Sequence, residues 1–254
     1  MDKKSSDNMG RLYVIGVGPG ASDLITVRAA RILAELDVIY TPTGKKGAKS
    51  LAHSIIEEYL LAETKVFTYH FLMKADIDAK NAVWDEVAHS LQEEVFNGRK
   101  VGFITLGDPM LFSTWVYLSQ RLVSTQMVIP PWLEIVPGIT SFSAIAAAST
   151  MPLAMENQTL AVISCTASET TLEQALLNHD CLVLMKVYSR FPLIRNLLQR
   201  HNLLEHALMM ADATLPGEQC WRDLTTLPFS EKDCRQELSY FSTILINKNW
   251  QLSR

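Results

Sequence analysis

Short apolar stretches alternate with helix-like patterns through the first half of the chain. The apolar stretches, which are typical of buried strands, lie at residues 11–17, 38–40, 65–69 and 101–104. A further strand is expected at residues 126–136. The segments between them, which have apolar residues at helical spacing, are residues 25–35, 50–61 and 79–96. Strands that alternate with helices are joined by right-handed crossovers and lie parallel in one sheet. The first half therefore predicts an α/β unit with a parallel sheet.

Three of the predicted strands run into loops rich in glycine, proline and hydroxyl residues. The loops read GVGPG at residues 16–20, LGDPMLFST at residues 106–114 and VPGITS at residues 136–141. In open α/β sheets, ligands bind at the carboxyl ends of the strands. The first loop lacks the dinucleotide-binding pattern, because Pro19 interrupts it and no third glycine follows at the required spacing. These loops are therefore candidate ligand sites of another kind.

The second and third loops are each expected to open a helix. Pro109 suits the first helical turn, where its missing N–H costs nothing. Asp108 is then placed either to cap that helix or to hold a ligand. In the third loop, Thr140 or Ser141 is expected to cap a helix of small residues. A plain capped helix explains each motif as well as a ligand site does.

A second unit rich in strands is predicted from residue 159 onward. Its strands are expected at residues 160–164, 181–187, 206–211 and 241–247, and its helices at residues 168–178 and 192–199. We place the boundary so that residues 10–150 form an N-terminal α/β domain and residues 151–254 a C-terminal α/β domain. A cleft between two domains is a favoured ligand site.

Composition and charge exclude several classes of protein. A net charge of −4 argues against a nucleic-acid partner, and no apolar run is long enough to cross a bilayer. The residues before Gly10 lack the apolar core of a secretory signal, so we expect a cytoplasmic protein without membrane association. The cysteines and histidines lack the spacing of metal ligands, and we predict no metal site.

The three loop motifs together resemble the tetrapyrrole (corrin/porphyrin) methyltransferase family. The segments LVLMKV at residues 182–187 and ADATLPGEQCWRD at residues 211–223 are similar to segments of that family's second domain. The resemblance implies two α/β domains with S-adenosyl-L-methionine in a cleft between them. It also implies S-adenosyl-L-homocysteine as product, a tetrapyrrole substrate and a homodimer.

Within the family, the chain is most similar to the branch that methylates C20 of precorrin-2 or cobalt-factor II in cobalamin biosynthesis. The segments YTPTGKKGAKSLA, WDEVAHSL, GDPMLFSTW and YFSTILI carry this similarity. The uroporphyrinogen methyltransferases are similar to one another in an Asp after the tyrosine of the second strand, where this chain has Thr41. Two alternatives stay open: another methyl acceptor, such as a different corrin intermediate or a diphthamide precursor, and a nucleotide-binding module without catalysis.

The resemblance also implies which residues bind cofactor and substrate. The expected cofactor residues are Pro19, Leu106, Gly107, Asp108, Leu111, Ser113, Thr114, Thr140, Ser141, Met185 and Ala213. The expected substrate residues are Tyr40, Thr41, Lys45, Lys46 and Lys49, where the lysines would face the carboxylates of a precorrin and are otherwise a solvated loop. The motifs identify no general base, and the catalytic residues stay unassigned.

Overall fold

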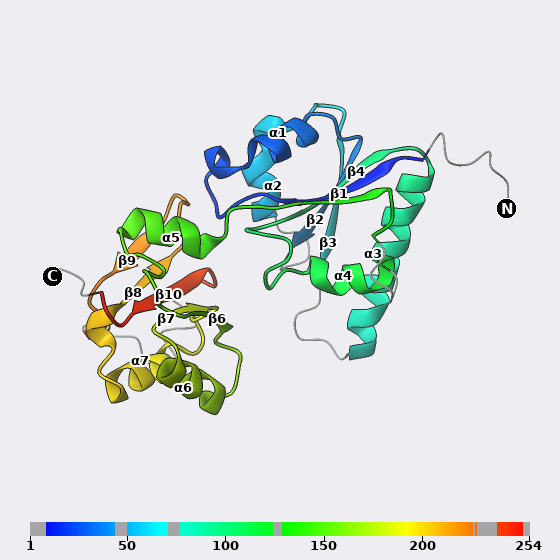
Figure 1. The fold of residues 1–254 in the computed structure, drawn as a ribbon. Helices are drawn as coiled ribbons and strands as arrows, with labels where there is room; N and C mark the ends of the chain where they lie inside the picture. Colours follow the sequence, from blue (N-terminus) through cyan, green and yellow to red (C-terminus); the bar gives the residue numbers. More distant parts are fainter. Residues whose placement is uncertain are drawn as a thin grey trace. The chain divides into compact units, whose positions relative to one another are not determined.

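The chain of 254 residues divides into two compact units, Met1–Thr140 and Ser141–Arg254. A computed structural model describes residues 9–43, 50–70, 77–123, 129–225, 227 and 238–250. Each unit is built around its own five-stranded sheet flanked by helices (Figure 1). The predicted α/β class is therefore confirmed for both halves of the chain.

The first sheet is parallel, as the alternation of strands and helices predicts. Its strands are β1 (Arg11–Gly16), β2 (Val38–Thr43), β3 (Lys65–His70), β4 (Lys100–Thr105) and β5 (Leu133–Val136). They lie in the order β3-β2-β4-β1-β5, and every pairing between them is parallel. Because β4, β1 and β5 are neighbours, the three loops that follow them leave the same edge of the sheet.

Helices cover both faces of the first sheet. On one face lie α1 (Val27–Leu33) and α2 (Leu51–Ile56), and on the other lie α3 (Ile77–Phe96) and α4 (Trp115–Leu122). The alternation of side chains along β1 explains this layering, since Val14 packs with α3 and α4 while Ile15 packs with α1 and α2. Short 3₁₀ turns occupy Ser22–Leu24 and Glu57–Tyr59.

The helix predicted to open at Pro109 begins only at Trp115. Phe112 has a φ of 49°, which is incompatible with a right-handed helix, so residues 106–114 form an extended loop. Asp108 accordingly caps a turn within the loop, where its Oδ1 accepts a hydrogen bond from the N–H of Met110 at 2.9 Å. The prediction that the helix opens at Pro109 is therefore wrong, and of the two roles left open for Asp108 the helix cap does not apply. The N–H of Trp115 instead donates to Ser113 Oγ at 3.1 Å.

The second sheet is mixed. Its strands are β6 (Leu160–Ser164), β7 (Cys181–Met185), β8 (Ala207–Ala211), β9 (Gln219–Trp221) and β10 (Ser242–Asn247). They lie in the order β6-β7-β10-β8-β9, where β6 and β7 are parallel and the other pairings are antiparallel. The three-residue strand β9 was not predicted, because it is too short to show a period.

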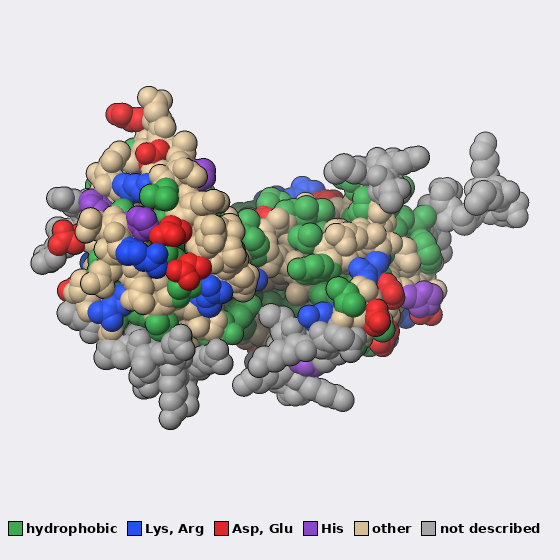
Figure 2. All heavy atoms as spheres, turned by 90° about the horizontal axis from the view of Figure 1, so that it is seen from below, with side chains coloured by type: hydrophobic (Ala, Val, Ile, Leu, Met, Phe, Trp, Pro, Cys, Tyr) green, Lys and Arg blue, Asp and Glu red, His purple; other side chains and the backbone are tan. Residues whose placement is uncertain are grey.

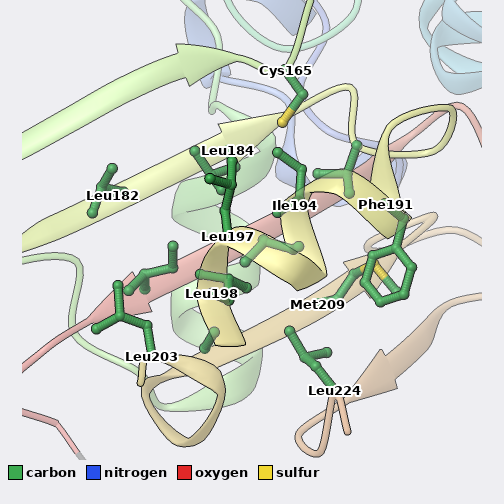
Figure 3. Packing of buried hydrophobic residues seen from close by; sticks show 14 of the residues in the cluster. Cys165, Leu182, Leu184, Phe191, Ile194, Leu197, Leu198, Leu203, Met209 and Leu224 are labelled. Carbon is green, nitrogen blue, oxygen red and sulfur yellow. The ribbon is translucent and has the colours of Figure 1, made fainter. Parts of the chain in front are cut away.

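Two helices, α6 (Glu169–Asn178) and α7 (Phe191–Arg200), cover one face of the second sheet. In Figure 3, Leu184 of β7 lies close to Ile194 and Leu197 of α7, in the largest apolar cluster of this unit. A 3₁₀ turn, Leu204–His206, follows α7. This face is therefore an apolar core, as the apolar spacing of α7 predicts.

The helix of small residues, α5 (Ser141–Ser149), packs on the other face of the second sheet. Its Ile145 shares an apolar cluster with Val183 of β7 and Met210 of β8. The contacts therefore group α5 with the second unit, whereas the boundary predicted between residues 150 and 151 places it in the first.

The surface over α6 and α7 carries intermixed charges, as the left of Figure 2 shows. Arg200 pairs with Glu169 and with Glu173 at 3.0 Å each, and His201 pairs with Glu173 at 2.9 Å. Exposed pairs of this kind contribute little to stability. Among the described residues, no helix is both long and apolar enough to cross a membrane.

Candidate functional site

The three loops at the carboxyl edge of the first sheet touch one another through their backbones. The N–H of Gly107 donates to the carbonyl oxygen of Gly18 at 2.8 Å and so joins the first loop to the second. A Cβ on Gly138 would lie 2.1 Å from the oxygen of Gly107, and a Cβ on Gly16 would lie 2.7 Å from the nitrogen of Gly138. Only glycine fits at Gly16 and Gly138, because neighbouring backbone occupies the place of a side chain.

Two further glycines set the direction of these loops. Gly18 has a φ of 80° and Gly107 a φ of 65°, both in the left-handed region that favours glycine. A Cβ on Gly107 would meet only the oxygen of Ile139, at 4.0 Å, so this part of the loop borders open space. The backbone around Gly107 is therefore accessible to a ligand.

Asp108 ties the second loop to the third. Its Oδ1 accepts from the N–H of Met110 at 2.9 Å, and its Oδ2 accepts from the N–H of Gly138 at 3.0 Å. The side chain is only partly buried, and each carboxylate oxygen has capacity for a second hydrogen bond. Asp108 therefore supports the loops and still presents acceptors to a ligand.

Three hydroxyl side chains lie on either side of Asp108 in the sequence. Thr105 Oγ1 and Ser113 Oγ lie 3.1 Å apart, and both side chains are buried. Thr114 Oγ1 is also buried, and it has no hydrogen-bond partner within the described part of the chain. Buried hydroxyls are normally satisfied. Thr114 is therefore a polar group that a bound molecule could satisfy.

The first and second loops also carry apolar side chains. Pro19, Leu106 and Leu111 are half-buried, while Met110 and Phe112 are 56% and 44% exposed. A largely apolar lining with a few placed polar groups is typical of sites for small organic molecules. The first and second loops, which are joined by the hydrogen bond between Gly107 and Gly18, thus carry all the predicted cofactor residues between Pro19 and Thr114.

The remaining predicted cofactor residues lie at the end of the first unit and in the second. Thr140 ends the first unit, and Ser141 opens α5. Met185, at the end of β7, and Ala213, just after β8, share one apolar cluster with Phe142 of α5. The second unit therefore gathers Ser141, Met185 and Ala213 around the start of α5.

The predicted substrate residues of β2 are buried. Tyr40 is 0% exposed, stacks on Tyr69 with ring centroids 5.5 Å apart, and shares a 2.8 Å hydrogen bond with Ser90 Oγ. Burial, the largest cause, raises the pKa of Tyr40 to about 12. The hydroxyl of Thr41 donates to Ser50 Oγ at 2.6 Å. Both side chains support the sheet edge here, and their contact with substrate stays a prediction.

The lysines predicted to bind substrate, Lys45, Lys46 and Lys49, lie outside the described residues. Their role stays a prediction from the sequence. Across the part of the chain that the structure describes, no group of three His, Cys, Asp or Glu side chains could hold a metal ion.

Sequence reasoning missed three residues of the second unit that adopt left-handed backbone angles. Lys186, Asp212 and Thr214 have φ values of 60°, 51° and 66°, although none of them is glycine. They follow β7 and β8 at one edge of the second sheet. The hydrophobic periodicity of a sequence does not indicate the backbone angle of a single residue. The only signal in the sequence was the position of Lys186 directly after the predicted cofactor residue Met185.

Known proteins resemble this chain over nearly its whole length. A family model described as Tetrapyrrole (Corrin/Porphyrin) Methylases matches residues 11–228. The cobalt-precorrin-2 C(20)-methyltransferase of Salmonella typhimurium is 59% identical over 242 residues, 95% of this chain and 98% of that protein. The precorrin-2 C(20)-methyltransferase of a Sinorhizobium species is 26% identical over 250 residues, 95% of this chain and 97% of that protein.

Solved structures show the same fold. The methyltransferase CobJ superposes with a TM-score of 0.66 at 19% identity, covering 96% of this chain and 97% of its own. A uroporphyrin-III-C-methyltransferase from Thermus thermophilus superposes with a TM-score of 0.66 at 21% identity, covering 94% of each chain. At such identities these likenesses concern the fold alone. The family match and the 59% identical relative show that this chain belongs to the tetrapyrrole (corrin/porphyrin) methylases.

Proposed function

We propose that this protein transfers a methyl group from S-adenosyl-L-methionine to C20 of cobalt-precorrin-2 in cobalamin biosynthesis. The observation that carries the proposal is the 59% identity, over 95% of this chain, to an enzyme named for that reaction. The relative named for precorrin-2 is only 26% identical, which favours the cobalt-containing substrate. S-adenosyl-L-homocysteine is then the second product.

The residues at the candidate site fit the proposed cofactor. Its ammonium and ribose hydroxyls are hydrogen-bond donors, and Asp108 is a partly exposed acceptor. Thr114 Oγ1 is a buried hydroxyl without a partner among the described residues, and Gly107 borders open space. The residues that would hold the cofactor are Pro19, Leu106, Gly107, Asp108, Leu111, Ser113, Thr114, Thr140, Ser141, Met185 and Ala213.

The protein's own contribution is mainly to position the reactants. When bound, the cofactor supplies an electrophilic methyl group on its sulfonium sulfur. Side chains such as Met185 and Ala213 would hold this methyl group in line with the substrate carbon, and alignment of this kind contributes up to about 7–11 kcal/mol in well-oriented systems. Thr41 donates its hydroxyl to Ser50 and provides no carboxylate. We therefore propose that no dedicated carboxylate base acts at this position.

The direct test is methyl transfer by the purified protein with radiolabelled S-adenosyl-L-methionine. We expect label to enter cobalt-precorrin-2, and mapping of the product should place the methyl group at C20. Metal-free precorrin-2 and uroporphyrinogen III, offered separately, serve as matched acceptors. Preference for either acceptor would overturn the proposed substrate. Cofactor binding without transfer to any of the three would identify a binding module instead.

We also propose that the protein is a cytoplasmic homodimer. The family resemblance supports the dimer, and the absence of a helix able to cross a membrane among the described residues agrees with the cytoplasm. Sedimentation equilibrium of the purified protein should give twice the mass of 28.5 kDa. A mass of one chain at micromolar concentration would contradict the dimer.

A further inference from the structure

Lys186 stands in a strained conformation that its neighbours enforce. The carbonyl oxygen of Met185 accepts from the N–H of Cys165 at 2.8 Å, and the N–H of Val187 donates to the oxygen of Ser242 at 3.2 Å. Val187 is also fully buried. Because the residues on both sides are held, Lys186 must turn between them with a φ of 60°. A side chain in the left-handed region costs about 1–2 kcal/mol, and such residues cluster at functional sites.

The surroundings of Lys186 combine partial burial with aromatic rings. Burial lowers the pKa of the Lys186 ammonium, so an anion that approaches it is less screened than at a surface lysine. Tyr188, two residues further on, contacts Tyr240 with ring centroids 5.3 Å apart. Tyr240 and Phe241, which precede β10, are 39% and 42% exposed. A cation two residues from a ring that contacts the exposed Tyr240 suits a flat apolar molecule that carries carboxylates.

We propose that Lys186 is a substrate-binding residue whose ammonium pairs with a carboxylate of the tetrapyrrole, while Tyr240 contacts the macrocycle. This inference rests on the proposed function, because a tetrapyrrole with several carboxylates is the ligand that matches this chemistry. It accounts for a lysine at a position where the backbone favours glycine. The strain is retained because the side chain is needed for binding.

The test separates substrate binding from folding and from cofactor binding. In Lys186→Gln, we expect the KM for cobalt-precorrin-2 to rise about tenfold or more, since a charge-assisted contact is lost. The kcat should stay within about twofold, and the Kd for S-adenosyl-L-methionine should not change. Lys186→Arg should restore most of the affinity because it retains the charge. Added salt should raise the KM of the unaltered protein more steeply than the KM of Lys186→Gln.

Two further variants keep this test decisive. Lys186→Gly suits the φ of 60° and should fold, so it reports the loss of the amine without new strain. Lys248→Gln is the matched control, because Lys248 follows β10 at the opposite edge of the sheet. Its backbone N–H donates to the carbonyl oxygen of Asp180. An unchanged KM in both Lys186→Gln and Lys186→Gly, or an equal rise in Lys248→Gln, would overturn the inference.

The outcome is distinguishable from failure of the proposed function. If the unaltered protein transfers no methyl group to cobalt-precorrin-2, the proposed function fails. Binding of the same tetrapyrrole, followed by quenching of tryptophan fluorescence, still measures the role of Lys186. Binding that is equal in the unaltered protein and in Lys186→Gln would refute the inference even in that case.

Discussion

The chain turns at the carboxyl edges of both sheets, but different residue types adopt the left-handed backbone angles there. Where the loops of the first sheet meet, glycine occupies the left-handed positions, with φ values of 80° at Gly18 and 65° at Gly107, while Phe112, further along the second loop, has a φ of 49°. The second sheet places Lys186, Asp212 and Thr214 at φ values of 60°, 51° and 66°. Glycine adopts such angles without steric cost, whereas a β-branched or long side chain does so against its preference.

The difference indicates that the two edges contribute to ligand binding in different ways. At the first edge, removal of side chains lets the three loops meet through their backbones and leaves the backbone near Gly107 open. At the second edge, side chains are kept despite the strain. We infer that the first edge acts mainly through its backbone and Asp108, and the second through particular side chains. The following predictions test this contrast, from the largest expected effect to the smallest.

Gly138→Ala should disrupt the first edge. Its Cβ would lie 2.1 Å from the oxygen of Gly107 and 2.8 Å from the backbone of Gly16, so a loop must move. Such overpacking should lower the free energy of unfolding by about 3 kcal/mol. Gly217→Ala is the matched control, because nothing lies within 4 Å of its added Cβ. Urea unfolding measures both, and equal stability of the two variants would refute the backbone contact.

Tyr40 tests whether polar side chains near the first edge are structural. Its pKa is raised from 10.0 to about 12, so its stabilising contribution is complete below pH 10 and is lost as the pH rises toward 12. The shift corresponds to about 3 kcal/mol. Tyr40→Phe should remove this part of the pH dependence while methyl transfer at neutral pH changes little. Thermal unfolding between pH 9 and about 12, compared with the unaltered protein, is the measurement. A large loss of kcat at neutral pH would instead give Tyr40 a role in the reaction.

Asp108 is the one acidic side chain that we expect to act directly at the first edge. Asp108→Ala removes charge-assisted acceptors, each worth roughly 1.5–3 kcal/mol, and should weaken binding of S-adenosyl-L-methionine accordingly. Titration calorimetry measures the change. Urea unfolding of the same variant reports the lost ties to Met110 and Gly138. An unchanged Kd in a folded variant would mean that Asp108 only connects the loops.

Exchanging the residue types at the two edges gives the smallest effects. Gly107→Ala meets no atom closer than 4.0 Å, so its cost is that of the backbone angle alone, about 1–2 kcal/mol. Lys186→Gly should raise the free energy of unfolding by about 0.5 kcal/mol, because relief of strain slightly exceeds the entropic cost of glycine. Urea unfolding of both variants is the measurement. A loss of stability in both would show that Lys186 is kept for packing.

The first sheet could be predicted well from the sequence, because the hydrophobic periodicity indicates which side chains are buried. The apolar strands and their alternation with helices defined a parallel sheet, and the loops after β1, β4 and β5 could be recognised at its edge. The path of the chain after Asp108 was not predictable, since nothing in the sequence indicates that Phe112 has a φ of 49°. For the same reason the strain at Lys186 stayed hidden. The helix α5 consists of small residues that suit either unit, so its place depended on contacts with Val183 and Met210.

The contact between Gly16 and Gly138 has a consequence for how the protein is made. These residues lie far apart in the chain, and β1 must pair with both β4 and β5 before the loops can meet. Non-local parallel pairing of this kind is slow to form. Until Leu133–Val136 has emerged from the ribosome, the nascent chain lacks β5 and therefore part of the carboxyl edge of the first sheet. The cofactor therefore cannot stabilise folding intermediates that form before that point. Cofactor supply during synthesis should therefore increase the yield of completed chains and leave shorter nascent chains unaffected.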